Sequence, residues 1–183
     1  MNQSLGHSVV VRAGELGDAE AICALGAIAF RLAHQSFLDE PSIDAIIAQT
    51  YNVTAVSEAI CRCDVADNAF FLVASTQTAV VGYLEYDAFG GEPELHRIYV
   101  DPAQKGAGLG TTMLEELHRR LRQPLNYRVV VASPNVAALR FYEHRGFRLE
   151  REVADSLYPG VILPEGSTPV TVSILRKTIE ERP

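Results

Sequence analysis

The sequence is poor in cysteine and contains no long apolar run. Its three cysteines, Cys23, Cys61 and Cys63, form no Cys-x-x-Cys pair and have no histidine at a zinc-site spacing, so neither a disulfide framework nor a metal site is expected. No stretch approaches the roughly 18 apolar residues that a transmembrane helix needs, and residues 1–8 lack the apolar core of a signal peptide. We therefore expect a cytoplasmic protein without a membrane partner.

Basic residues are also scarce relative to acidic ones. Lysine and arginine total 16 against 23 aspartates and glutamates, which gives a formal net charge of -7. This sign disfavours broad attachment to nucleic acid or to an anionic membrane and suits a cationic small-molecule substrate better. A chain of 183 residues is long enough for one core, so residues 1–183 are expected to form a single domain, and a homodimer stays open.

Three glycines, Gly106, Gly108 and Gly110, lie between an apolar run at 95–100 and an amphipathic segment that starts near Thr111. Without side chains they allow the backbone to approach a ligand and to aim several N–H groups at one point. The helix predicted behind them adds its unpaired N–H groups and the positive end of its dipole. The segment therefore predicts a loop that binds an anion such as a pyrophosphate; a turn whose glycines solve only a steric problem is the alternative.

The spacing around the loop argues against two common phosphate-binding patterns. A nucleoside triphosphate loop needs Lys followed by Ser or Thr after its last glycine, whereas Thr111 and Thr112 follow Gly110. A dinucleotide-binding fold needs an acid roughly 20 residues further on, and no Asp or Glu occurs between Glu116 and Glu143. A third pattern remains: a basic or amide residue, two residues, Gly, one residue, Gly.

Lys105, Gly108 and Gly110 satisfy this third pattern, which resembles the acetyl-CoA loop of the GNAT N-acetyltransferase superfamily. A second segment, 135–147, is similar to a later motif of the same family: an Asn, a short helix with a Tyr, then Gly-Phe. From the local pattern alone, Asn135 is a good helix N-cap and Tyr142 would be a core aromatic at helical spacing. Two motifs in the correct order favour the family and a functional role for Tyr142.

The resemblance implies acetyl-CoA as the acyl donor and assigns roles to individual residues. Backbone groups of Ile98, Tyr99 and Val100 would pair with the pantetheine arm and help bind the thioester carbonyl, Asn135 would bond the same arm, and Tyr142 would protonate the departing thiolate. The residues implied around the pyrophosphate are Lys105, Gly106, Ala107, Gly108, Leu109, Gly110 and Thr111. Lys105 departs from the Arg or Gln more usual in the family, since it keeps a donor but loses the planar fork.

Acetyl transfer to an amine also needs a base or a water relay, because an alkylamine with a pKa near 10.4 is almost entirely protonated at pH 7. Glu94 is the first candidate, since it starts the strand that leads to the loop, where some family members place a base. His96, two residues on and therefore on the same face of a regular strand, could share or relay the proton. A solvated strand end and a satisfied histidine are the alternatives. The base position of another branch corresponds to Val130, which cannot serve.

The hydrophobic periodicity predicts an alternating set of strands and helices. Strands are expected over 9–13, 70–75, 79–86, 95–100, 128–132, 147–153 and 170–175, and helices over 18–33, from a Ser42 cap, from a Thr54 cap to Ile60, over 111–122 and after Asn135. This order suits a mixed, mostly antiparallel central sheet with helices on both faces. It also matches the GNAT α/β (α+β) fold.

The sequence indicates less about the acceptor than about the acyl donor. The helical N-terminal third, with Phe30, Phe37 and Tyr51, resembles bacterial diamine and polyamine N-acetyltransferases, and residues 34–64 are expected to cover the acceptor side. Four acids, Glu85, Asp87, Glu92 and Glu94, could form an acidic entrance, and a solvated acidic face is the alternative. The expected activity is direct acetyl transfer to a primary amine, with polyamines the leading class. A protein lysine or N-terminal amine, and a non-catalytic CoA-ester sensor, are the alternatives.

Overall fold

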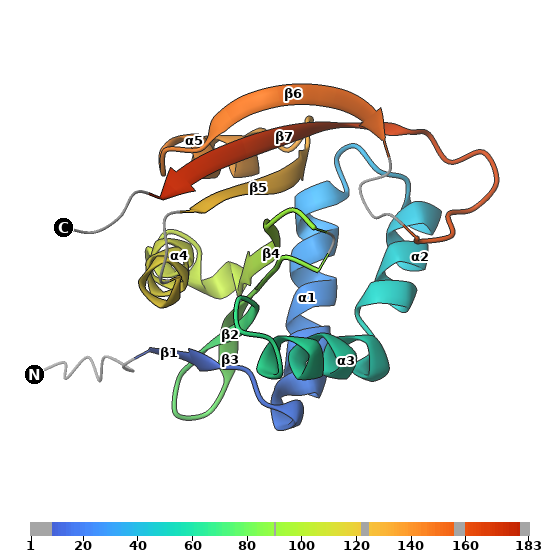
Figure 1. Cartoon of the computed structure of the whole chain (residues 1–183). Helices are drawn as coiled ribbons and strands as arrows, with labels where there is room; N and C mark the ends of the chain where they lie inside the picture. Colours follow the sequence, from blue (N-terminus) through green and yellow to red (C-terminus); the bar gives the residue numbers. More distant parts are fainter. Residues whose placement is uncertain (1–8, 90, 122–124, 156–159, 180–183) are drawn as a thin grey trace, which may run out of the picture.

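A computed structural model of the chain describes residues 9–89, 91–121, 125–155 and 160–179, and its strands form one seven-stranded sheet (Figure 1). The strand order is β1-β2-β3-β4-β5-β7-β6, and every neighbouring pair is antiparallel except β4 and β5. The strands are β1 Val10–Ala13, β2 Phe70–Ser75, β3 Val80–Asp87, β4 Glu94–Val100, β5 Leu125–Ala132, β6 Arg148–Asp155 and β7 Val170–Ile179. The predicted mixed, mostly antiparallel sheet is confirmed.

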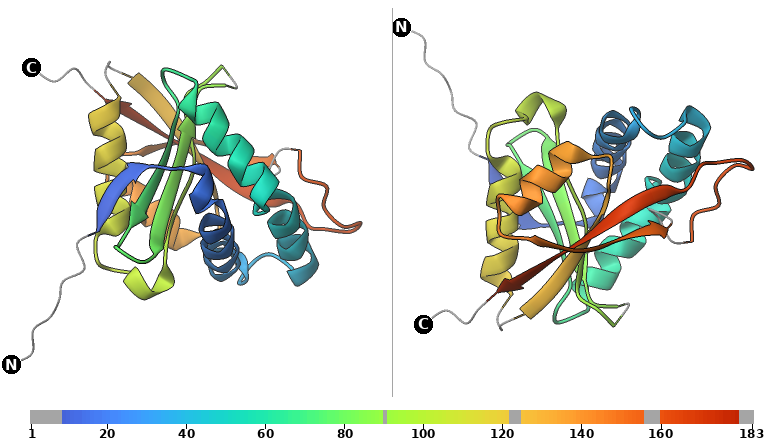
Figure 2. Two further views of the ribbon diagram at one scale, coloured as in Figure 1. Left: turned by 90° about the horizontal axis from the view of Figure 1, so that it is seen from below. Right: turned by 90° about the horizontal axis from the view of Figure 1, so that it is seen from above.

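Helices cover both faces of the sheet, as predicted (Figure 2). They are α1 Ala19–His34, α2 Glu40–Thr50, α3 Val53–Asp64, α4 Leu109–Arg120 and α5 Val136–Glu143, with short 3-10 turns at Leu16–Asp18 and Pro102–Gln104. The first three helices lie on one face, and α4 and α5 lie on the other. Among the described residues, no helix is both long enough and apolar enough to cross a membrane.

The alternation of side chains along β2 explains why helices pack on both faces of the sheet. Leu72 and Ala74 point toward the α4 face and belong to the same apolar cluster as Met113. Phe71 and Val73 point the other way and pack in the cluster beneath α1 and α3. Because successive strand side chains point to opposite faces, a continuous apolar run is buried on both.

Two helices begin earlier than the sequence suggested. The side chain of Asp39 accepts a hydrogen bond from the Ser42 N–H at 2.8 Å, so α2 starts at Glu40 and Ser42 is not its cap. Asn52 caps α3 in the same way by accepting from Ala55 N–H at 2.9 Å, so the prediction of a Thr54 cap was wrong. In both cases an Asp or Asn upstream offers a carboxylate or amide oxygen to an N–H group of the first turn.

The helix behind the glycine loop also starts two residues earlier, at Leu109, because Gly108 is its N-cap. Its predicted end at Arg122 lies outside the described residues. Strands β5 and β7 are longer than predicted and pair over eight positions, from Leu125↔Ile179 to Ala132↔Val172.

The feature of the sheet that leaves an edge of β4 unpaired is the short pairing between β4 and β5. These parallel strands pair only at Glu94↔Arg128 and Leu95↔Val129, whereas β5 pairs with β7 along its whole length. Within the described residues, the edge of β4 that faces β5 therefore has no strand partner from His96 to Val100. The sheet splits at this point, and its unpaired backbone groups are available to an extended ligand.

Candidate active site

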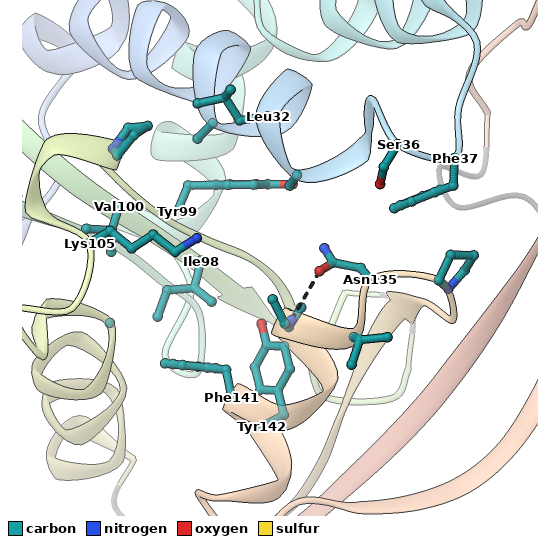
Figure 3. A pocket seen from close by; sticks show the side chains of 18 residues that line it. Leu32, Ser36, Phe37, Ile98, Tyr99, Val100, Lys105, Asn135, Phe141 and Tyr142 are labelled. Carbon is teal, nitrogen blue, oxygen red and sulfur yellow. Dashed lines mark hydrogen bonds between the residues drawn. The ribbon is translucent and has the colours of Figure 1, made fainter.

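Two cavities lie against the split between β4 and β5. The first has a volume of about 580 Å³ and extends over the glycine loop, α5 and the end of α1 (Figure 3). The second has a volume of about 470 Å³ and is lined by charged residues at the start of β4 and by Arg128 in the middle of β5. The residues that line both are Ile98, Tyr99, Asn135, Ala138 and Tyr142. Molecules in the two cavities would therefore meet at the free edge of β4.

The glycine loop is built to hold an anion. Gly106 and Gly108 have φ values of 86° and 79°, in the left-handed region, and a Cβ at either would meet no atom within 4 Å. Within the described residues, the N–H groups of Gly106, Gly108, Leu109 and Gly110 donate to no other protein group. These donors lie at the positive end of α4, and Lys105 extends from the loop into the first cavity (Figure 3).

Gly110 has an additional structural role. A Cβ at this position would lie 3.1 Å from Cε2 of Phe141, so the absence of a side chain lets α5 pack closely on the start of α4. Arg145, which the sequence reasoning missed, strengthens the same junction. Its guanidinium lies 3.8 Å from the centroid of Phe141, and its Nε donates to Oγ1 of Thr111 at 3.1 Å. The Thr111 hydroxyl is thus engaged by Arg145.

Tyr142 of α5 and Asn135 at its N-cap both lie at the junction of the cavities. Tyr142 is 5% exposed, and its hydroxyl points from α5 toward β4 (Figure 3). Burial raises the pKa of Tyr142 well above its ordinary value, so the phenol stays protonated at neutral pH. Asn135 caps α5 by accepting from Ala138 N–H at 3.1 Å, which confirms the predicted cap and leaves its amide hydrogens available.

His96 lies between two carboxylates across an irregularity in β4. The register passes from Glu85↔Arg97 to Tyr86↔Leu95, so His96 is an extra residue and the assumption of a regular strand was wrong. It nevertheless stays close to Glu94, with Nδ1 3.5 Å from Oε1, while Nε2 lies 3.0 Å from Oδ1 of Asp87. Burial alone would lower the pKa of His96, but the hydrogen bonds with Glu94 and Asp87 outweigh it and raise the pKa to about 9. The ring is therefore charged at neutral pH.

Glu94 lies at the centre of a charge network. Burial favours its neutral form, but hydrogen bonds from His96 and Arg128 are stronger, and together they lower the pKa of Glu94. The Nε of Arg128 lies 2.7 Å from Glu94, and its other arm reaches Glu92 at 2.6 Å. Arg176 donates to the second oxygen of Glu92, also at 2.6 Å. Glu94 is therefore an ionised carboxylate whose charge is largely compensated.

The predicted acidic entrance is wrong for two of its four members. Glu85 is 2% exposed and lies 2.7 Å from Nε of Arg97, while Asp87 is 5% exposed beneath His96. Buried carboxylates need such partners, because an unpaired charge away from water is costly. Only Glu92 and Glu94 line the second cavity.

The rest of the second cavity comes from segments distant in the sequence. His34 closes it at the end of α1, and Val161 closes it from the segment between β6 and β7. Gln49 of α2 holds that segment through two hydrogen bonds to the backbone of Ile162, at 2.8 and 3.0 Å. Tyr51 lines neither cavity and packs beside Arg97, whose guanidinium lies 5.4 Å from the ring centroid. In the sequence, the indication that His34 could line a cavity was its position as a polar residue at the end of an apolar helix.

Comparisons with known proteins agree with this arrangement. The family model described as the acetyltransferase (GNAT) family matches residues 33–147. A spermidine N(1)-acetyltransferase of Thermoplasma acidophilum is 23% identical over 145 residues, which cover 78% of this chain and 90% of that protein. The crystal structure of the PaiA N-acetyltransferase from the same organism in complex with coenzyme A aligns with a TM-score of 0.76 and 21% identity, over 94% of this chain and 99% of that one. YncA of Salmonella typhimurium, a putative acetyltransferase solved with acetyl-CoA, aligns with a TM-score of 0.60 and 19% identity over 95% of each chain.

Proposed function

Because the chain belongs to the GNAT family of acetyltransferases, we propose that it transfers the acetyl group of acetyl-CoA directly to a primary amine of a small cationic acceptor, with linear polyamines the leading class. The observation that carries this proposal is the pair of cavities that share Tyr142, Asn135 and the edge of β4. A donor in one and an amine in the other can react without a covalent enzyme intermediate.

The first cavity is the donor side of this proposal. Acetyl-CoA supplies the acyl group as a reactive thioester. The free N–H groups of the glycine loop hold its pyrophosphate, with Lys105 as a nearby cation, and the open edge of β4 at Ile98, Tyr99 and Val100 pairs with the pantetheine arm. Asn135, whose amide hydrogens are not used by the helix cap, donates to the same arm.

Tyr142 and Glu94 handle the protons in this scheme. The phenol of Tyr142 is protonated and buried at the junction, so it donates to the departing sulfur; a thiolate formed in the same apolar surroundings is itself a stronger base than in water. On the acceptor side, the ionised Glu94 attracts the ammonium group and is the first candidate to take its proton. His96 loses its own proton only as the pH rises toward 9, and it can then take the proton that the amine must lose.

Three features support a small cationic acceptor. The second cavity has a volume of about 470 Å³, which lies in the range of small-molecule sites. Glu92 and Glu94 line it, and the chain carries a net charge of -7. The Thermoplasma acidophilum relative is named as a spermidine acetyltransferase. A protein lysine or N-terminal amine and a non-catalytic CoA-ester sensor are the competing hypotheses.

A competition assay tests the acceptor class. Thiol release from acetyl-CoA would be measured with putrescine, spermidine, free amino acids, aminoglycosides and lysine peptides at fixed acetyl-CoA and at several salt concentrations. We expect preference for the polyamines, weakened by salt because the attraction is electrostatic. Preference for a peptide would exclude the polyamine assignment and leave acetyl transfer intact. Tight CoA binding with no turnover on any amine would favour the sensor.

A further inference from the structure

His34 is a buried histidine at the end of α1 that the scheme above does not use. It is 5% exposed, and its ring stacks on Phe30 with centroids 4.0 Å apart and planes 23° apart. Phe37 packs edge-on against the other side, with centroids 5.4 Å apart. His34 also lines the second cavity. A polar aromatic ring, held in one orientation by two neighbours, thus borders the space assigned to the acceptor.

The hydrogen bonding of this ring defines its tautomer. Nδ1 lies 2.8 Å from the backbone oxygen of Phe30. A carbonyl oxygen can only accept, so Nδ1 carries the hydrogen and Nε2 carries a lone pair. Burial lowers the pKa of His34 to about 4, against a smaller opposite effect of the Phe30 carbonyl, so the ring is neutral at pH 7. Nε2 is therefore a hydrogen-bond acceptor under ordinary conditions.

Other ionisable groups of the second cavity are already engaged. Both carboxylate oxygens of Glu92 and of Glu94 lie within ion-pair distance of a cation, and both ring nitrogens of His96 face a carboxylate. In the part of the chain that the structure describes, no protein group donates to Nε2 of His34. Because His34 lines the second cavity, a ligand there can donate the hydrogen that Nε2 is able to accept.

We propose that Nε2 of His34 accepts a hydrogen bond from an N–H group of the acceptor and thereby orients the amine in the second cavity. The inference rests on the proposed function only in requiring an amine acceptor, whether polyamine or peptide. A lone pair at this point favours an amine or ammonium group and disfavours a carboxylate, which has no hydrogen to donate. His34 is in this sense a specificity-determining residue on the acceptor side.

Steady-state kinetics of two variants test the role. His34→Phe keeps an aromatic ring against Phe30 but removes the lone pair, and His34→Gln keeps an acceptor. With spermidine as the probe, we expect His34→Phe to raise the acceptor KM by about tenfold to a hundredfold, the range for a buried hydrogen bond to a charged donor, and His34→Gln to restore part of the loss. The KM for acetyl-CoA and the Tm should stay close to those of the wild type. Gln35→Ala, an exposed neighbour that lines neither cavity, is the matched control.

An unchanged acceptor KM in His34→Phe would overturn the proposal. A KM for acetyl-CoA that rises as much as the KM for spermidine, together with a lower Tm, would also overturn it. That pattern belongs to a purely structural histidine. The split between the two KM values therefore separates substrate contact from packing.

Nitrogen NMR of the wild-type protein gives a second readout that needs no turnover and no variant. In the CoA-bound protein, titration with spermidine, n-butylamine or a lysine peptide should move the Nε2 resonance of His34 as it gains a donor. Movement with the peptide alone would exclude the polyamine acceptor while supporting the role of His34. No movement with any amine would exclude the role itself.

Discussion

The Nε2 atom of His96 lies 3.0 Å from Oδ1 of Asp87, a carboxylate that is 5% exposed. The contact holds a charged imidazole in the lining of the second cavity and links a residue of β4 to the end of β3. Because the opposite ring nitrogen faces Glu94, the imidazole lies between two carboxylates.

We predict that this pair makes the folded protein more stable at neutral than at alkaline pH. The pKa of His96 is raised to about 9, above the value near 6.5 of an unfolded histidine, so the folded state binds the extra proton. The contribution is complete below about pH 6.5 and is lost as the pH rises through 9. Thermal melts between pH 6 and 10 should show a steeper alkaline decline for the wild type than for Asp87→Asn. Parallel curves would contradict the assignment of the proton to His96.

We predict that Tyr142→Phe lowers kcat by about 10²-fold to 10⁴-fold, the range for a lost general acid, while binding of acetyl-CoA is retained. The ring still packs on Phe147, so only the hydroxyl is lost. Tyr127→Phe is the control, because its buried hydroxyl bonds His118 at 2.7 Å and lines neither cavity. Stopped-flow and steady-state rates with saturating substrates measure the effect. Wild-type turnover in the Tyr142 variant would remove it from this role.

We predict that Gly108→Val raises the Kd for acetyl-CoA by tenfold or more. The residue has a φ of 79°, which costs a side-chain-bearing residue about 1–2 kcal/mol, and its Cβ would project into the open space before the loop. Gly166→Val is the matched control, since its φ is 84° with equally open surroundings and it lies outside the glycine loop. Calorimetric titration of both folded variants distinguishes them. Equal affinities would mean that the anion is bound elsewhere.

We predict that Glu94→Gln slows turnover most at the lower end of the pH range, where the amine is fully protonated and needs the carboxylate. The variant loses the charge partner of both His96 and Arg128 but keeps a similar shape. The pH profile of kcat/KM for spermidine is the measurement. A loss of equal size at every pH would indicate that Glu94 positions the acceptor and takes no part in proton transfer.

The donor half of the site could be predicted from the sequence because it is local. Gly106 and Gly108 adopt the left-handed backbone that their lack of a Cβ permits, and Asn135 caps the helix that carries Tyr142. Each of these features depends on residues within a few positions of one another. The order of strands and helices was predictable for the same reason, since it follows from short-range periodicity.

The acceptor half could not be predicted in this way because it is assembled from distant segments. His34, Arg128 and Val161 meet only through the register of the sheet and the packing of α1 on it. The bulge at His96 and the burial of Glu85 beside Arg97 depend on the same register. A single-residue change in register reverses which face a side chain occupies, so the charges of a strand do not reveal which of them are paired.

The last prediction concerns acid, and its sign is opposite to that for His96. The pKa of His34 is lowered to about 4 in the folded state, below the value near 6.5 of an unfolded histidine, so the unfolded state binds the proton more readily. The associated stability is present above pH 6.5 and is lost as the pH falls through 4, by up to about 3 kcal/mol. Chemical denaturation at pH 7 and pH 4.5 should therefore show a smaller difference in the free energy of unfolding for His34→Phe than for the wild type, with Gln35→Ala behaving like the wild type. If both proteins lose the same stability, the acid sensitivity arises from other groups, and His34 is not the neutral, buried ring that the proposed contact with the acceptor requires.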